Sequence, residues 1–230
     1  MKPIHSIYIS HTSACSGWDI DEIISGTIYK KACSASRFPK TESNIRMLDW
    51  DFRSIKKFGF KKVWGKYLTI VQNNRFDIVF APDSYIDSEP KQIVDCYHEL
   101  KKYVPRVVIP LHGYFDEYEG LELSYPNADG FNVVPKNYWI WDIKNQITHI
   151  LGGSPHKQFE LKQMLPNVIS LDGNQMFSCA IRTGKYWENG KWVSAGKDNG
   201  QFAMTCQEMF VKSLKNFENF LAKNRLRLNI

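Results

Sequence analysis

Aspartates recur directly after short apolar runs of this sequence. The residues that close such runs are Asp49, Asp51, Asp83 and Asp172. Carboxylates that converge on one cleft raise one another's pKa, so one can act as an acid while another stays ionised. Cleavage of a glycosidic bond needs this division, because one carboxylate stabilises or captures the sugar carbon while a second group manages the proton of the departing base. We take Asp172 as the candidate reactive carboxylate and Asp49 or Asp51 as the proton-handling acid.

Each of these aspartates has a simpler explanation when it is taken singly. An acid after a strand often caps the next helix or binds loop amides. The set as a whole is harder to explain in this way, because the acids recur at equivalent places in successive units. A barrel of parallel strands would bring them to one rim, where such folds place their chemistry.

A strand-helix-strand pattern surrounds Asp172. The segment His149–Pro155 is an apolar run that ends in two glycines, an amphipathic segment follows it, and Val168–Asn174 is a second apolar run. Gly152, Gly153 and Ser154 could cradle a phosphate through backbone amides ahead of a helix. We therefore count these three residues, together with Asn174, as candidate substrate-binding residues.

Apolar and β-type runs alternate with helical patterns along the whole chain. Strands are predicted at Ile7–Ser13, Ile45–Asp51, Asp77–Ser84, Arg106–Gly113, Gly130–Pro135, His149–Leu151 and Val168–Asp172, and helices at about Asp19–Ser25, Lys61–Asn73, Ser88–Tyr103, Gln158–Leu165 and Met204–Leu221. The alternation predicts an α/β fold, namely a compact TIM-like (β/α) barrel with some irregular or missing helices. An open doubly wound sheet is disfavoured, since no glycine-rich dinucleotide loop and no P-loop occurs. We expect residues 1–230 to form one domain.

The composition is that of a globular soluble protein. The chain has 230 residues, 43% of them hydrophobic, and no apolar run long enough to cross a bilayer, so no membrane partner is expected. The N-terminus has no apolar signal region and we expect a cytoplasmic protein. The five cysteines are scattered and the histidines lack close metal-ligand spacing, so neither a metal nor another cofactor is predicted.

Positive charge is in excess and is clustered. The net charge is +6, and Lys56, Lys57, Lys61 and Lys62 flank two phenylalanines. Such a pattern permits binding to a polyanion such as nucleic acid. A hairpin with an Asn-Gly turn is predicted at Tyr186–Trp192. It is either a packed flap or, with Arg182 and Lys185, a contact for a nucleic-acid backbone.

The order of the strand ends resembles that of the tRNA-guanine transglycosylase superfamily, in particular the short phage and bacterial relatives of the 7-deazaguanine DNA transglycosylases. The segments that carry the resemblance are Met47–Phe52, Asp77–Asp83 (similar to Asp-Ile-x-Met-Ala-Phe-Asp), Val107–Gly113, Ala128–Phe131, His149–Pro155 (similar to Tyr-Leu-Met-Gly-Val-Gly-Thr-Pro), Val168–Asp172 and Arg182–Gly184. The resemblance implies that Asp172 is the nucleophile, Asp49 a proton-handling acid and Asp83 a group that faces the base.

The sequence also departs from the pattern of that superfamily. Shifting the last strand so that Met176–Cys179 aligns with Met-Phe-Asp-Cys would put Ser178 in place of the nucleophile. The base-reading glutamine falls near Leu111 or His112. The Cys-x-Cys-x-x-Cys zinc module is absent, with Cys206 alone in that region, which disfavours a tRNA-specific enzyme.

The expected function is therefore cleavage of the N-glycosidic bond of a nucleotide in DNA. Asp83, His112 and Gly113 would hold the extruded base. We expect hydrolysis, meaning a DNA glycosylase that removes a modified base in conflict between phage and host. The alternatives are exchange of the base for a 7-deazaguanine, a non-catalytic nucleic-acid-binding barrel, and a barrel that processes a small sugar or nucleotide.

Overall fold

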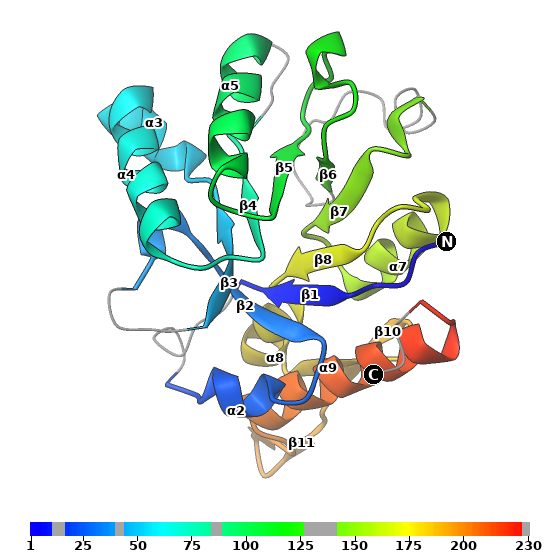
Figure 1. The fold of residues 1–230 in the computed structure, drawn as a ribbon. Coiled ribbons are helices and arrows are strands. Elements are labelled where there is room, and N and C mark those ends of the chain that lie inside the picture. The colour runs from blue at the N-terminus through cyan, green and yellow to red at the C-terminus, as the bar shows by residue number, and fades with distance from the viewer. Residues whose placement is uncertain (11–16, 40–43, 84–88, 127–141, 227–230) are drawn as a thin grey trace.

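Eight parallel strands close into a barrel in the computed structural model of the chain, which describes residues 1–10, 17–39, 44–83, 89–126 and 142–226 (Figure 1). The strands are β1 (Ser6–Ile9), β2 (Tyr29–Ser34), β3 (Ile45–Asp49), β4 (Ile78–Phe80), β5 (Arg106–Pro110), β6 (Leu123–Pro126), β7 (Ile147–Leu151) and β8 (Ser170–Gly173). Strand β8 pairs with β1, with Asp172 opposite Tyr8, so the sheet has no open edge. The predicted TIM-like barrel is confirmed.

The helices that cover the barrel differ widely in length. They are α2 (Ile20–Ile24), α3 (Phe52–Phe58), α4 (Phe60–Asn73), α5 (Pro90–Lys101), α7 (Pro155–Met164), α8 (Gln175–Thr183) and α9 (Cys206–Lys223). The described parts of two connections, β2 to β3 and β5 to β6, hold only the single 3-10 turns Ala35–Arg37 and Asp116–Tyr118. The expected irregularity of the helical layer is thus present. In the described part of the chain, no helix is long and apolar enough to cross a membrane.

Two strands of the barrel were not predicted. In β2 the apolar pattern is interrupted by Lys31, whose buried side chain is paired with Asp21 at 2.8 Å between Nζ and Oδ2. Strand β6 is short and contains the fully buried Ser124. The strand predicted at Gly130–Pro135 lies outside the described residues, as does the segment Ala128–Phe131.

Helix α9 closes the barrel on the side of β1 and β2. The predicted hairpin is confirmed as β9 (Lys185–Glu188) paired antiparallel with β10 (Lys191–Ser194). A second small hairpin, β11 (Lys197–Asp198) with β12 (Gln201–Phe202), lies between β10 and α9. Trp187 of β9 packs on the rings of Phe217 and Phe220 of α9. Because Trp187 is only 1% exposed, the hairpin is anchored as part of the core.

Tyr67 holds the strand ends that carry two of the candidate acids. It lies on the buried face of α4, and its hydroxyl contacts the carbonyl oxygens of Phe80 at 2.7 Å and of Leu48 at 3.2 Å. Phe80 ends β4, and Leu48 immediately precedes Asp49 at the end of β3. One side chain therefore fixes the two neighbouring strand ends against α4.

Replacing Tyr67 with phenylalanine should lower the free energy of unfolding by about 1–3 kcal/mol, because buried carbonyl oxygens lose their donor. At this chain length the melting temperature should fall by several degrees. The matched control is Tyr103→Phe, because the Tyr103 side chain is 44% exposed and its hydroxyl contacts only the surface residues Gln72 and Glu99. Equal melting temperatures for the two variants would contradict this role of Tyr67.

Candidate active site

A pocket of about 460 Å³ opens at the carboxyl ends of the barrel strands. This volume lies in the range of small-molecule sites and is sufficient for a nucleobase with part of its sugar. The predicted residues that line the pocket are Asp49, Asp83, His112, Gly152, Gly153, Asp172 and Asn174. They come from the ends of five different strands and the turns that follow them, as the barrel topology requires.

Other predicted residues lie away from the pocket lining. Asp51 precedes α3 and accepts a hydrogen bond from the hydroxyl of Ser54, while Ser154 caps α7 by accepting from the backbone amide of Lys157. Gly113 is buried beside His112, and Arg182 and Lys185 are exposed at the end of α8 and the start of β9. For Asp51 and Ser154 the structure thus shows local helix-start contacts.

Several lining residues were not singled out from the sequence. Ser10, Phe52, Arg53 and Gln175 each follow a strand closely and lie in the lining of the pocket. The available signal was position alone, since the first residues after a barrel strand also face the rim. Ser178, the alternative to Asp172 as nucleophile, lines the pocket as well, but it lies in α8 and not on a strand.

Asp49 has a strongly perturbed carboxyl group in the pocket. Burial raises the pKa of its carboxyl well above the usual 3.8, and the nearby carboxylates of Asp83 and Asp172 raise it further. The backbone amide of Trp50 donates to Asp49 and opposes the shift only in part. Asp49 is therefore suited to carry a proton at a pH where an ordinary carboxyl group has lost it.

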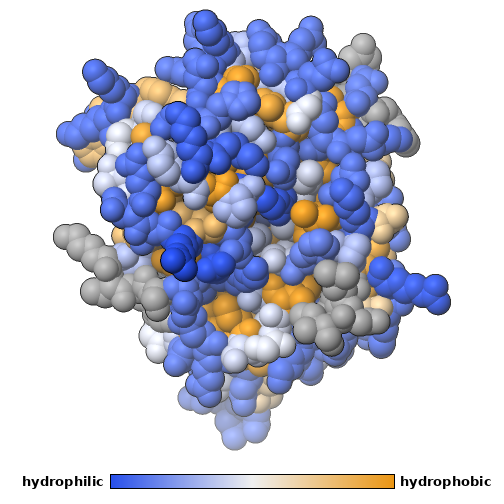
Figure 2. Space-filling model, in the orientation of Figure 1, coloured by the Kyte–Doolittle hydropathy of each residue, from blue (hydrophilic) through white to orange (hydrophobic). Residues whose placement is uncertain are grey.

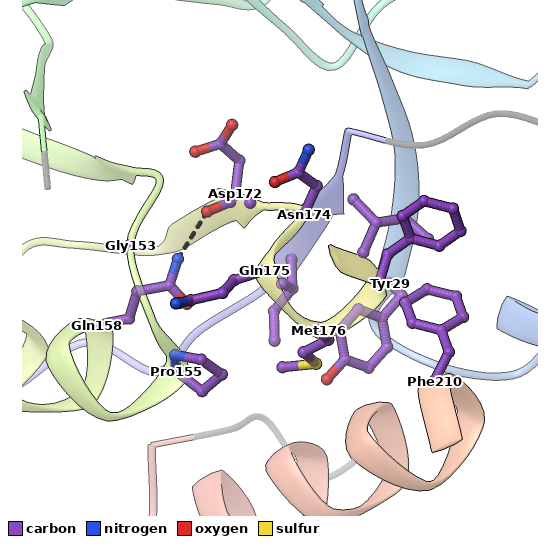
Figure 3. A pocket seen from close by; sticks show the side chains of 13 residues that line it. Tyr29, Gly153, Pro155, Gln158, Asp172, Asn174, Gln175, Met176 and Phe210 are labelled. Carbon is purple, nitrogen blue, oxygen red and sulfur yellow. Dashed lines mark hydrogen bonds between the residues drawn. The ribbon is translucent and has the colours of Figure 1, made fainter. Parts of the chain in front are cut away.

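The side chain of Asp172 is held by the turn after β7. Its Oδ1 accepts a hydrogen bond of 2.7 Å from the backbone amide of Gly152, where a φ of 72° favours glycine. Gln158 of α7 donates to the backbone carbonyls of Asp172 at 2.6 Å and of Gly152 at 3.0 Å. Figure 3 shows Gln158 reaching toward β8 while the Asp172 carboxylate points the other way. Gln158 thus links the backbone of β8 at Asp172 to the turn after β7, and the carboxylate projects from this fixed backbone.

Beneath Asp172 lies a second, much smaller cavity between β8, β1 and the helices α8 and α9. Its volume is about 20 Å³, and Tyr29 and Phe210 contribute to its lining (Figure 3). This space suffices for about one water molecule and is too small for a base. The larger pocket is therefore the place for a substrate.

His149 lies near the same oxygen of the Asp172 carboxylate. Its Nε2 lies 3.5 Å from Asp172 Oδ1, and its Nδ1 lies 2.8 Å from the hydroxyl of Ser170. That hydroxyl accepts a hydrogen bond from Arg106, which can only donate, and its own hydrogen can be donated to Nδ1. The proton of the neutral ring then stays on Nε2, facing Asp172. Burial lowers the pKa of His149, which keeps the ring neutral.

No metal site is evident in the described ranges of the chain. Among these residues, no group of three or more histidine, cysteine, aspartate or glutamate side chains is placed to hold a metal ion.

Comparison with known proteins places the chain in a sequence family without describing its activity. The model of a family described as a family of unknown function, DUF6610, matches residues 21–222. The match begins in α2 and ends in α9, and so includes every acid of the pocket. No curated protein matches the chain. The function must be argued from the site.

Asp49→Asn should stabilise the fold at neutral pH. A carboxyl whose pKa is raised in the folded state loses its proton more readily in the unfolded state, so stability falls as pH rises from about 3.8 through the raised pKa. The near-isosteric amide removes this penalty, and we expect a melting temperature a few degrees above that of the wild type at pH 7, with the difference vanishing below about pH 4. The exposed Asp116→Asn serves as the control. An unchanged or lower melting temperature for Asp49→Asn at pH 7 would argue against the perturbed carboxyl.

The imidazole of His149 should remain a neutral Nε2–H tautomer. We expect its ¹⁵N chemical shifts to be those of a neutral ring at neutral pH, because burial lowers the pKa of His149 below the usual 6.5. The His149→Gln variant assigns the signals. A His149 ring that gains a proton near pH 6.5, or that carries its proton on Nδ1, would contradict the proposed order of hydrogen bonds.

Proposed function

The chain belongs to the DUF6610 family of unknown function, and we propose that it is a DNA glycosylase, which cleaves the N-glycosidic bond between a modified base and its deoxyribose. The observation that carries the proposal is the unlike environment of two carboxyls in one pocket. Asp49 has a raised pKa, while the carboxylate of Asp172 accepts a hydrogen bond from the backbone amide of Gly152. Pairs of carboxyls in unlike environments are typical of glycosidic chemistry.

In the first step Asp172 acts on the sugar and Asp49 on the base. The bond between C1′ and the base nitrogen breaks, its electron pair leaves with the base, and Asp49 supplies the proton that neutralises it. Asp172 either forms a bond to C1′ or stabilises the oxocarbenium-like carbon electrostatically. The backbone amide of Gly152 donates to Asp172 Oδ1 and holds the carboxylate in place, while the Nε2 of His149 lies 3.5 Å from the same oxygen.

In the second step water completes the hydrolysis. A water oxygen bonds to C1′, its proton passes to the Asp49 carboxylate, and any ester bond from C1′ to Asp172 breaks. Both carboxyls return to their starting state and the DNA retains an abasic sugar. If a free 7-deazaguanine attacked in place of water, the same two residues would exchange the base.

The nature of the substrate is supported by the pocket and by the resemblance to 7-deazaguanine DNA transglycosylases. A base inside duplex DNA cannot reach the rim of a barrel, so the nucleotide must be extruded into the pocket. His112 and Asp83 line the pocket, and we assign to them the contacts with the base. Burial lowers the pKa of His112, so its neutral ring has one donor and one acceptor for the edge of a base.

Asp172→Asn should abolish base release while leaving DNA binding intact. The substitution changes little volume and removes the negative charge that faces C1′, so we expect the rate to fall at least about 100-fold. The assay incubates the protein with DNAs that carry ordinary, 7-deazaguanine or glucosylated hydroxymethyl bases, and it follows alkali-labile strand breaks together with released base. Incorporation of labelled free base without abasic product would show that the reaction is base exchange and not hydrolysis.

The same assay decides which acid handles the proton. Asp49→Asn should greatly lower the rate of base release, whereas Asp51→Asn should retain most of it. Asp51 lies outside the pocket lining and accepts a hydrogen bond from the hydroxyl of Ser54. The exposed Asp116→Asn is the control for loss of one negative charge. Binding without base release or incorporation from any DNA would leave a non-catalytic nucleic-acid-binding barrel. Turnover of free nucleosides at a rate that added DNA does not change would indicate a small-molecule enzyme.

A further inference from the structure

The segment from Phe52 to Phe76 accounts for the net positive charge of the molecule. It contains seven lysines and arginines and no aspartate or glutamate. Because the whole chain has a net charge of only +6, the rest of the chain is close to neutral. The segment forms α3 and α4, two successive helices joined at Gly59, and Figure 1 shows both on the same side of the barrel.

These cations are exposed and are not neutralised by neighbouring acids. The α3–α4 basic surface comprises Arg53, Lys56, Lys57, Lys61, Lys62 and Lys66, all of them solvent-exposed. The ion pairs found in the described part of the chain involve none of these six residues. A surface with so much uncompensated charge attracts a polyanion.

Exposed aromatic rings lie among the cations. Phe58 is 47% exposed, and the ammonium groups of Lys57 and Lys62 lie 5.0 and 5.4 Å from the centre of its ring. Phe52 is 38% exposed, with the guanidinium of Arg53 5.6 Å from its ring centre. In Figure 2, hydrophilic and paler apolar side chains alternate over the part of the molecule where Figure 1 places α3 and α4. Exposed rings between cations suit unpaired bases, which stack while the phosphates meet the charges.

The basic surface is continuous with the pocket. Phe52 and Arg53 belong both to the first turn of α3 and to the pocket lining. Below them Trp50 packs against Phe60 and Trp64 of α4, with ring centres 5.9 and 6.1 Å apart. Trp50 is buried and also lines the pocket, so the helices that carry the cations are fixed relative to the carboxylates.

From this arrangement we infer that the α3–α4 basic surface binds the single-stranded DNA beside the extruded nucleotide, with its phosphates on the lysines and a base stacked on Phe58. The inference rests on the proposed function, since it supplies the substrate strand to the same pocket. It assigns the backbone contact to a surface other than Arg182 and Lys185, neither of which lies in the pocket lining.

The test measures binding separately from chemistry. The probe is fluorescein-labelled oligothymidine, and its affinity is followed by anisotropy over a range of salt concentrations. Replacing Lys56, Lys57, Lys61 and Lys62 together with alanine should weaken binding about 10- to 100-fold at low salt and reduce the slope of log K against log salt. The matched control replaces four exposed lysines elsewhere with alanine, namely Lys91, Lys191, Lys215 and Lys223. Circular dichroism and thermal unfolding establish that both variants fold.

Phe58→Ala tests for stacking. It should weaken binding of oligothymidine about fivefold or more and leave binding of an equally long abasic oligonucleotide unchanged, because only the former has bases to stack. Equal losses in the two quadruple variants would overturn the assignment of this surface. A loss confined to the α3–α4 variant, with no effect of Phe58→Ala, would overturn single-strand recognition and leave a general polyanion surface.

The proposed function and this inference fail in different ways. If no DNA loses a base but the α3–α4 variant alone loses affinity for oligothymidine, the inferred binding surface is supported and the proposed glycosylase activity is refuted. If base release is observed and the α3–α4 variant binds and cleaves like the wild type, the proposed glycosylase activity is supported and the inferred binding surface is refuted.

Discussion

Electrostatic repulsion among carboxylates at one rim of the barrel is the constraint on which the rest of the site depends. Asp49 and Asp172 lie in one pocket with Asp83, and their proximity and burial together raise the pKa of Asp49. Such groups would move apart if the backbone allowed it. Tyr67 prevents this by fixing the ends of β3 and β4, and Gln158 does so by linking Asp172 to the turn after β7. The fold thus maintains a costly arrangement in which the carboxyl with a raised pKa, Asp49, shares a pocket with Asp172.

The charges of the molecule are separated in a way that suits a nucleotide in DNA. Acids lie inside the pocket, where a sugar carbon would develop positive charge, and cations lie outside it on α3 and α4, where phosphates would pass. Arg53 lies at the boundary between the two regions. A pocket of carboxylates alone would repel DNA, so an adjoining positive surface is the physical complement that the chemistry needs.

The sequence was sufficient for the barrel and for the strand-end acids, because parallel strands point the same way and their ends share a rim. It was insufficient where a residue's role depends on partners that only barrel closure brings near. Lys31 interrupts the apolar pattern of β2, so the pattern does not indicate a strand. Its side chain can be buried because its charge is paired with Asp21 of the preceding helix. The orientation of His149 toward Asp172 depends on Arg106, which reaches it through a hydroxyl on another strand. The predicted site residue Asp51 lies only two positions after Asp49, yet there the chain has already turned into α3.

The most direct test of this account is the ¹³C NMR signal of the Asp49 side-chain carboxyl, assigned with the Asp49→Asn variant and followed over pH. We expect the Asp49 carboxyl to keep the chemical shift of a protonated carboxylic acid above pH 3.8 and to titrate well above that value. Replacing Asp172 with asparagine should move the Asp49 titration to lower pH, since one of the charges that raises its pKa is gone. An Asp49 carboxyl that ionises near the usual 3.8, and that does not respond to the Asp172 substitution, would contradict the division of roles on which the proposed chemistry rests.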